Sequence, residues 1–179
     1  MSIHRLILLT PYLGPKEVLS QTISSVIGQL DRKDIWIIIL DNQNIDEYIY
    51  LEKKYEQLTF LSYVGPSGAG NCRNMGLDYI AEKIDGEFLL LPFDGDDSLA
   101  DFGVNIVKQT MKYDSFNIIS FAHCKIWPNG TKRVISYSGT FNLKDLLKRY
   151  ITPCGSTVLK IKNSEILKNF RFSNRFRVN

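Results

Sequence analysis

Short apolar runs alternate with helix-like patterns through the first half of the chain. The runs cover residues 3–9, 35–40, 59–64 and 87–92, and turn-forming or acidic residues follow them. Continuous apolar runs of this length are typical of strands that a parallel sheet buries on both faces. The sequence therefore predicts four buried strands, the first of which should stop at Thr10-Pro11, because proline cannot donate to a strand ladder.

Helical periodicity fills the intervals between these runs. Apolar and small side chains recur every three or four residues over residues 18–30, which predicts an amphipathic helix with Pro15 at its first position. Similar patterns cover residues 46–56 and 72–84. Strands that alternate with helices form right-handed βαβ units, so we expect an α/β, Rossmann-like, three-layer α/β/α domain with a mostly parallel central sheet.

The second half of the chain is less regular. A fifth apolar run covers residues 117–123, and residues 125–127 and 132–137 indicate a hairpin joined through Pro128-Asn129-Gly130. The other expected elements are a short helix from Asn142 and a strand over residues 156–161. A chain of 179 residues fits one compact domain, so we expect residues 1–179 to fold as a single unit.

Polar and glycine-rich clusters follow the predicted strands. The clusters are Thr10-Pro11-Tyr12, Asp41-Asn42, Gly68-Ala69-Gly70 and the segment from Asp94 to Asp97. Ligands of doubly wound sheets bind beyond the carboxyl ends of the parallel strands. We therefore expect these four clusters to converge on one edge of the sheet and to form a binding site there.

Asp94, Asp96 and Asp97 place three carboxylates within four residues, with no lysine or arginine close by in sequence. Such crowding is electrostatically costly without a cation, and hard oxygen ligands held on a turn suit Mg²⁺ or Mn²⁺. The alternative interpretation is an Asp-Gly turn followed by a helix N-cap at Asp97 or Ser98, which requires no metal.

Asp41 and Arg73 are further candidate binding residues. Asp41 follows an apolar strand, where its carboxylate is suited either to accept hydrogen bonds from a base or ribose, or to cap the next turn. Arg73 lies near the start of a helix entered through glycines, where backbone amides and a guanidinium suit phosphate oxygens. A surface salt bridge is the alternative role for Arg73.

Composition narrows the class of protein. Hydrophobic residues make up 44% of the chain and the net charge is +3, as in ordinary folded domains. No apolar run is long enough to cross a bilayer and no signal peptide is recognisable, so we expect a cytoplasmic protein. The three cysteines are widely spaced and form neither a disulfide framework nor a zinc motif.

Basic residues predominate from Phe141 onward, where only Asp145 and Glu165 are acidic. No helix-turn-helix, RNA-recognition or zinc signature accompanies them, so we expect no nucleic acid as a partner. Solvated helix faces account for such a distribution. The alternative is peripheral contact with an anionic lipid surface on the inner face of a membrane.

Several of these motifs occur in a fixed order. They are Thr10-Pro11-Tyr12, Ser24-Ser25-Val26-Ile27-Gly28-Gln29, Ile39-Leu40-Asp41-Asn42-Gln43-Asn44-Ile45-Asp46, Gly68-Ala69-Gly70-Asn71-Cys72-Arg73-Asn74-Met75-Gly76-Leu77, Gly86-Glu87-Phe88 and Asp94-Gly95-Asp96-Asp97. This ordered series resembles family 2 glycosyltransferases of the GT-A fold. The resemblance implies that residues 1–100 bind a nucleotide and that residues 101–179 form part of the acceptor side.

The resemblance also implies roles for individual residues. The implied nucleotide-binding residues are Thr10, Pro11, Tyr12, Asp41, Asn42, Arg73, Asp94 and Gly95. Asp96 and Asp97 would hold a Mn²⁺ or Mg²⁺ cofactor that offsets charge on a departing nucleoside diphosphate. Uridine is the expected nucleoside, although Asn42-Gln43-Asn44 replaces the acidic-glycine-serine run that is more usual in the family.

The implied reaction is an inverting, metal-dependent transfer of a sugar from a nucleotide-diphospho-sugar, expected to be a UDP-sugar, to a saccharide or lipid-linked acceptor. Such a displacement requires a carboxylate that deprotonates the acceptor. Residues 152–157 and 170–172 resemble the approach to the family's base motif, but no acidic residue follows Glu165. We therefore expect the chain to be the first part of a longer protein, with the catalytic base beyond Asn179.

Two other functions are compatible with these residues. A chain that lacks a catalytic base is suited to serve as a non-catalytic nucleotide-sugar-binding module. A sugar nucleotidyltransferase shares the sheet and the metal carboxylates, but its loop after the first strand usually contains arginine and lysine. In this chain that loop, residues 10–15, contains no cation.

Overall fold

The computed structural model describes residues 5–112, 117–135 and 156–172 of the chain. The helix expected from Asn142, the carboxylate of Asp145 and the motif at residues 152–155 lie outside the described residues. Among the described residues, no helix has both the length and the apolar character that spanning a bilayer requires.

A six-stranded sheet forms the centre of the fold, in the order β3-β2-β1-β4-β8-β5. Its strands are β1 (Arg5–Tyr12), β2 (Ile35–Asp41), β3 (Leu58–Tyr63), β4 (Phe88–Pro92), β5 (Ile118–Ser120) and β8 (Thr157–Ile161). Strands β1 to β4 pair in parallel, whereas β8 is antiparallel to both β4 and β5. The predicted α/β class and mostly parallel sheet are confirmed.

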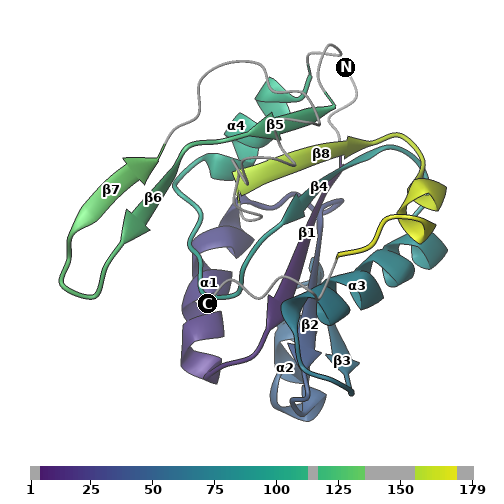
Figure 1. Cartoon of the computed structure of the whole chain (residues 1–179), viewed down its shortest axis with the longest axis horizontal. Coiled ribbons are helices and arrows are strands. Elements are labelled where there is room, and N and C mark those ends of the chain that lie inside the picture. The colour runs from purple at the N-terminus through teal and green to yellow at the C-terminus, as the bar shows by residue number, and fades with distance from the viewer. Residues whose placement is uncertain (1–4, 113–116, 136–155, 173–179) are drawn as a thin grey trace.

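Helices cover both faces of this sheet (Figure 1). They are α1 (Lys16–Val26), α2 (Ile49–Lys54), α3 (Ala69–Lys83) and α4 (Gly103–Thr110), with the shorter 3-10 helices η1 (Ile27–Gln29), η2 (Ile45–Glu47) and η4 (Ser164–Lys168). Leu6 and Leu8 of β1 belong to the core shared with α1 and α4, whereas Ile7 and Leu9 belong to the core shared with α3 and η4. Since alternate residues serve two cores, β1 is apolar throughout and three layers result.

Strand β1 continues beyond its predicted end at Thr10-Pro11 and reaches Tyr12. The carbonyl of Leu9 accepts the Phe93 amide at 3.0 Å, so alternate residues of β1 present their backbone groups to β4. Pro11 has no N–H to donate toward β4. Because β4 ends at Pro92, no hydrogen bond between the two strands is lost at this position. The prediction for Pro15 is also wrong by one position, since Pro15 is the N-cap of α1.

The predicted hairpin is confirmed with shifted ends. Strand β6 (His123–Ile126) pairs in antiparallel register with β7 (Lys132–Ile135). Gly130 in the connecting turn has a φ of 81°, a backbone conformation that favours glycine. The hairpin projects away from the central sheet (Figure 1).

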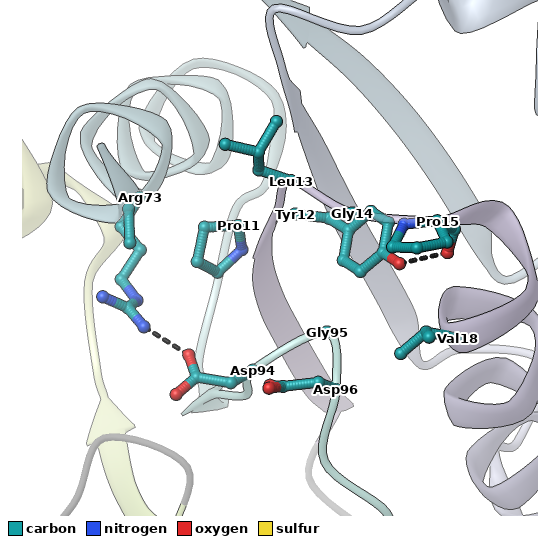
Figure 2. Close-up of a pocket in the computed structure, with 11 residues that line it drawn as sticks. Pro11, Tyr12, Leu13, Gly14, Pro15, Val18, Arg73, Asp94, Gly95 and Asp96 are labelled. Carbon is teal, nitrogen blue, oxygen red and sulfur yellow. Dashed lines mark hydrogen bonds and ion pairs between the residues drawn. The ribbon is translucent and has the colours of Figure 1, made fainter. Parts of the chain in front are cut away.

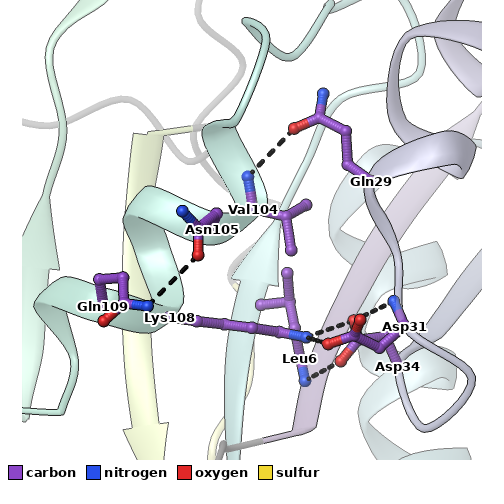
Figure 3. A network of polar contacts seen from close by, with 8 residues as sticks. All are labelled: Leu6, Gln29, Asp31, Asp34, Val104, Asn105, Lys108 and Gln109. Atoms are coloured by element: carbon purple, nitrogen blue, oxygen red, sulfur yellow. Dashed lines mark hydrogen bonds and ion pairs between the residues drawn. The ribbon is translucent and has the colours of Figure 1, made fainter.

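A buried ion pair connects α4 to the loop before β2 (Figure 3). Nζ of Lys108 lies 2.5 Å from Oδ2 of Asp34 and 2.8 Å from Oδ2 of Asp31. The fully buried carboxylate of Asp34 also accepts the backbone N–H groups of Leu6 at 2.9 Å and Asp31 at 2.8 Å. The network therefore joins α4 to the amino ends of β1 and β2.

Helix α3 packs closely on the sheet at Gly76. An added Cβ would overlap the side chain of Leu9 and lie 3.0 Å from Cδ1 of Ile39. We expect Gly76→Ala to lower the free energy of unfolding by about 1–3 kcal/mol, because overpacking moves buried neighbours. Gly28→Ala is the control, since nothing lies within 4 Å of the added atom. Urea unfolding checks both variants, and equal midpoints would contradict the close packing.

Candidate active site

A pocket of about 420 Å³ opens beyond the carboxyl ends of β1 and β4 (Figure 2). The residues that line it are Pro11, Tyr12, Leu13, Gly14, Pro15, Val18, Ala69, Arg73, Asp94, Gly95 and Asp96. Three of the four predicted clusters therefore contribute to one site: the end of β1, the start of α3 and the acidic segment after β4. They meet because neighbouring parallel strands end at the same edge of the sheet.

Tyr12 and Gly95 form one wall of the pocket in close contact. A Cβ on Gly95 would overlap the Tyr12 ring, so glycine is required for this approach. The hydroxyl of Tyr12 donates to the carbonyl of Pro15, and Thr22 of α1 donates to the carbonyl of Gly95 at 2.8 Å. Burial raises the pKa of Tyr12 above its usual value. These contacts hold the end of β1, the start of α1 and the acidic loop together.

Arg73 crosses from α3 to the acidic loop (Figure 2). Its Nη2 forms an ion pair with Oδ1 of Asp94, and its side chain is only 12% exposed. Arg73 therefore does form a salt bridge, as the alternative interpretation predicted, but its side chain is sheltered while that of Asp94 is partly exposed. The buried Nε of Arg73 has no hydrogen-bond partner among the described residues. A sheltered guanidinium on a pocket wall has the charge and donor geometry that phosphate oxygens require.

The acidic segment forms a tight turn. The backbone N–H of Asp97 donates to the carbonyl of Asp94 at 3.2 Å. The turn predicted for this segment is thus present, but the N-cap predicted at Asp97 or Ser98 is absent, because α4 begins only at Gly103 with Phe102 as its N-cap. The turn aims Asp94 at Arg73 and leaves Asp96 and Asp97 exposed.

Asp96 and Asp97 have the properties expected of carboxylates that accept a cation. Arg73 pairs with Asp94, whereas no ion pair involves Asp96 or Asp97 within the described part of the chain. Although the residue surface of Asp97 is exposed, desolvation of its carboxyl and repulsion from Asp94 and Asp96 raise its pKa to about 6. A nearby divalent ion would relieve this repulsion.

The described side chains supply only part of a metal coordination shell. No group of three His, Cys, Asp or Glu residues converges among residues 5–112, 117–135 and 156–172. Mg²⁺ and Mn²⁺ sites that act on phosphates often use one or two carboxylates, with substrate oxygens and water as the remaining ligands. The donor set fits that kind of ion, and it does not fit a closed structural metal site.

Asp41 holds the loop that leads into α3. The residue is 3% exposed, and its Oδ2 accepts hydrogen bonds from the Ser67 hydroxyl at 2.7 Å and the Gly68 amide at 2.9 Å. Its Oδ1 accepts the side-chain amide of Asn42 at 2.8 Å. Asp41 and Asn42 therefore stabilise the neighbouring loop, and neither contributes to the pocket lining described above.

Thr10 lies beneath the pocket, in the core. It is fully buried, and its hydroxyl accepts a hydrogen bond from Nε1 of Trp36 at 2.8 Å. Sequence patterns also missed part of the pocket lining, namely Leu13, Gly14, Pro15 and Val18, whereas Ala69 belongs to the predicted glycine-rich cluster. These residues carry no charge or nucleophile, so only the Gly14-Pro15 turn signal marked their position beyond the first strand.

Comparison with known proteins yields matches in structure alone. No protein-family model and no curated protein sequence matches the chain. TarS of S. aureus, residues 1–349, is 16% identical with a TM-score of 0.64, over 92% of this chain and 48% of that one. The mannosyltransferase PcManGT from Pyrobaculum calidifontis, solved with GDP-Man and Mn²⁺, is 14% identical with a TM-score of 0.50, over 70% and 36% of the two chains.

A third similar structure is 4-diphosphocytidyl-2C-methyl-D-erythritol synthase. It is 11% identical with a TM-score of 0.55, over 94% of this chain and 81% of that one. At such identities the likeness concerns the fold alone, which is a GT-A-like α/β fold with a mostly parallel central sheet. The chain spans about half the length of the TarS structure.

Proposed function

We propose that the chain is the donor-binding domain of a metal-dependent glycosyltransferase of the family 2 type. The observation that carries the proposal is the meeting of Arg73, Asp94 and Asp96 in one pocket at the carboxyl edge of the sheet. The Arg73 guanidinium is suited to bind phosphate oxygens. The nearby carboxylate of Asp96 is suited to bind a divalent ion that bridges to the same diphosphate. The ordered motifs around these residues support the same class.

The proposed roles follow the position of each side chain. Arg73 contacts the diphosphate, while Asp94 orients Arg73 and lies near the ribose or sugar. Pro11, Tyr12 and Gly95 form the wall against which the nucleoside packs. Asp96 and Asp97 hold Mn²⁺ or Mg²⁺, which when bound supplies positive charge beside the departing nucleoside diphosphate.

Asp41, Asn42 and Thr10 have a more indirect part in this proposal. Asp41 and Asn42 would contact the base at the edge of the pocket while they hold the loop before α3. Thr10 would support Pro11 and Tyr12 from the core. Asp41 is 3% exposed and both of its carboxylate oxygens accept hydrogen bonds in the loop, so direct contact with a base would require one of these bonds to be exchanged.

The structural neighbours support the donor class. TarS has a structure in complex with UDP-GlcNAc, and PcManGT one with GDP-Man and Mn²⁺. We propose a UDP-sugar as donor, inversion at the transferred sugar, and a saccharide or lipid-linked acceptor. In such a reaction a carboxylate would deprotonate the acceptor.

Isothermal titration with UDP tests the proposal. We expect micromolar to millimolar binding in MnCl₂ and at least about tenfold weaker binding in EDTA, because phosphate and carboxylate charges repel without the ion. GDP and CDP in the same buffer report the base preference. Failure of all three nucleotides to bind in a metal-dependent manner would reject the proposal.

A sugar nucleotidyltransferase is the second candidate, favoured by the extent of the match to 4-diphosphocytidyl-2C-methyl-D-erythritol synthase. Release of pyrophosphate from a nucleoside triphosphate and a sugar phosphate would support it. Nucleotide binding without transfer or donor hydrolysis, tested on the intact gene product with a broad acceptor panel, would instead indicate a binding module. The glycosyltransferase proposal predicts neither pyrophosphate release nor nucleotide binding without sugar transfer.

A further inference from the structure

A segment late in the chain packs along α3 beside the pocket. Leu167 of η4 is buried in the core that includes α3. After η4 ends, Arg171 pairs with Asp78 of α3 at 2.7 Å. Phe172 then reaches Asn74, one helical turn closer to the pocket. The segment therefore follows one face of the helix toward the end that carries Arg73.

Asn74 binds this segment through two hydrogen bonds. Its side-chain amide donates to the carbonyl of Phe172 at 3.1 Å and its side-chain carbonyl accepts the amide of Phe172 at 2.8 Å, although the residues are 98 positions apart. Both backbone groups of Phe172 are satisfied by one side chain, which fixes the residue in place as a neighbouring strand would. Neither the fold nor the proposed donor contacts assign any other role to Asn74.

The fixed Phe172 ring lies over the guanidinium of Arg73. The Cζ of Arg73 is 5.4 Å from the ring centroid, a distance at which the ring face attracts the cation. Asp94 holds the far end of the same guanidinium. The guanidinium thus contacts both an aromatic ring and a carboxylate, and its buried Nε has no hydrogen-bond partner in the part of the chain that the structure describes.

We propose that Asn74 and Phe172 are positioning residues for Arg73, and that they hold its guanidinium in the orientation that receives the donor diphosphate. The inference rests on the proposed function. A long arginine side chain loses rotamer freedom when it binds an anion, and a side chain that is already confined loses less. Loss of either positioning residue should therefore weaken diphosphate binding without removing a contact to the ligand.

Titration of UDP in MnCl₂ tests this inference on four variants. Phe172→Leu keeps apolar packing but removes the ring face, and we expect about fivefold weaker binding. Asn74→Ala should have a similar effect, and Phe172→Tyr should restore wild-type affinity. Asp78→Asn is the matched control, because it breaks only the exposed ion pair of the same segment, and binding should change less than about twofold.

A double-mutant cycle separates positioning from general destabilisation. In an Arg73→Ala background, Phe172→Leu should produce no further loss of UDP affinity, since the side chain that it orients is gone. An additive loss in that background, or wild-type affinity in both Asn74→Ala and Phe172→Leu, would overturn the inference. Absence of metal-dependent UDP binding by the wild-type chain would instead reject the proposed function. Thermal melts establish that each variant is folded.

Discussion

Asp96→Asn is expected to abolish the effect of metal on UDP binding. The substitution keeps the size of the side chain but removes the charge that would bind the cation, while Asp96 is exposed and makes no ion pair in the described chain. Loss of a residue that only hydrogen-bonds to a metal ligand typically lowers the affinity for the metal by about 10–100-fold. Loss of a ligand's charge should therefore lower the affinity for the metal by at least about 100-fold. The variant in MnCl₂ should bind UDP as weakly as the wild type does in EDTA.

The control for this prediction is Asp101→Asn, which removes an exposed carboxylate close to the acidic loop in sequence but outside the pocket lining. Its UDP affinity should stay within about twofold of wild type, since an exposed charge outside the pocket lining is screened by water and salt. Equal losses in Asp96→Asn and Asp101→Asn would mean that general electrostatics, and no bound ion, control the affinity.

Asp34→Ala is expected to cause the largest loss of stability. The substitution leaves Lys108 without its buried partner and leaves two backbone N–H groups, of Leu6 and Asp31, without acceptors. Breaking a buried ion pair on one side typically costs about 3–5 kcal/mol. That amount is a large share of the stability of an ordinary domain, so the urea midpoint should fall markedly.

An exposed ion pair nearby provides the comparison. Arg32 and Glu56 lie 3.3 Å apart, with side chains 92% and 63% exposed. Arg32→Ala should change the free energy of unfolding by less than about 1 kcal/mol, because water and salt screen such pairs. If Asp34→Ala cost no more than Arg32→Ala, the network drawn in Figure 3 would not be a principal anchor of α4.

The class of fold and the meeting of three polar clusters at one pocket were predictable from local patterns. The runs that became β1 to β4 are apolar because both faces of the sheet are covered, and this requirement repeats at every residue of a strand. The acidic turn at Asp94 and the glycines before Arg73 lie in the loops that follow β4 and β3, so the parallel topology placed both at one edge of the sheet. Pro11, Tyr12, Gly95 and Asp96 reached the pocket for the same reason.

Tertiary contacts decided what individual polar groups do. The carboxylate of Asp41 accepts hydrogen bonds from Ser67 and Gly68 in the loop before α3. The hydroxyl of Thr10 accepts a hydrogen bond from Trp36, 26 positions away. Asn74 meets Phe172 across 98 positions. A hydrophobic periodicity can be recognised within a few consecutive residues. The partner of a side-chain hydrogen bond, in contrast, depends on which distant segment packs beside that side chain. The sequence by itself therefore determined the layers and the edge of the sheet where the pocket lies, and only the packed structure determined the partners of each polar side chain.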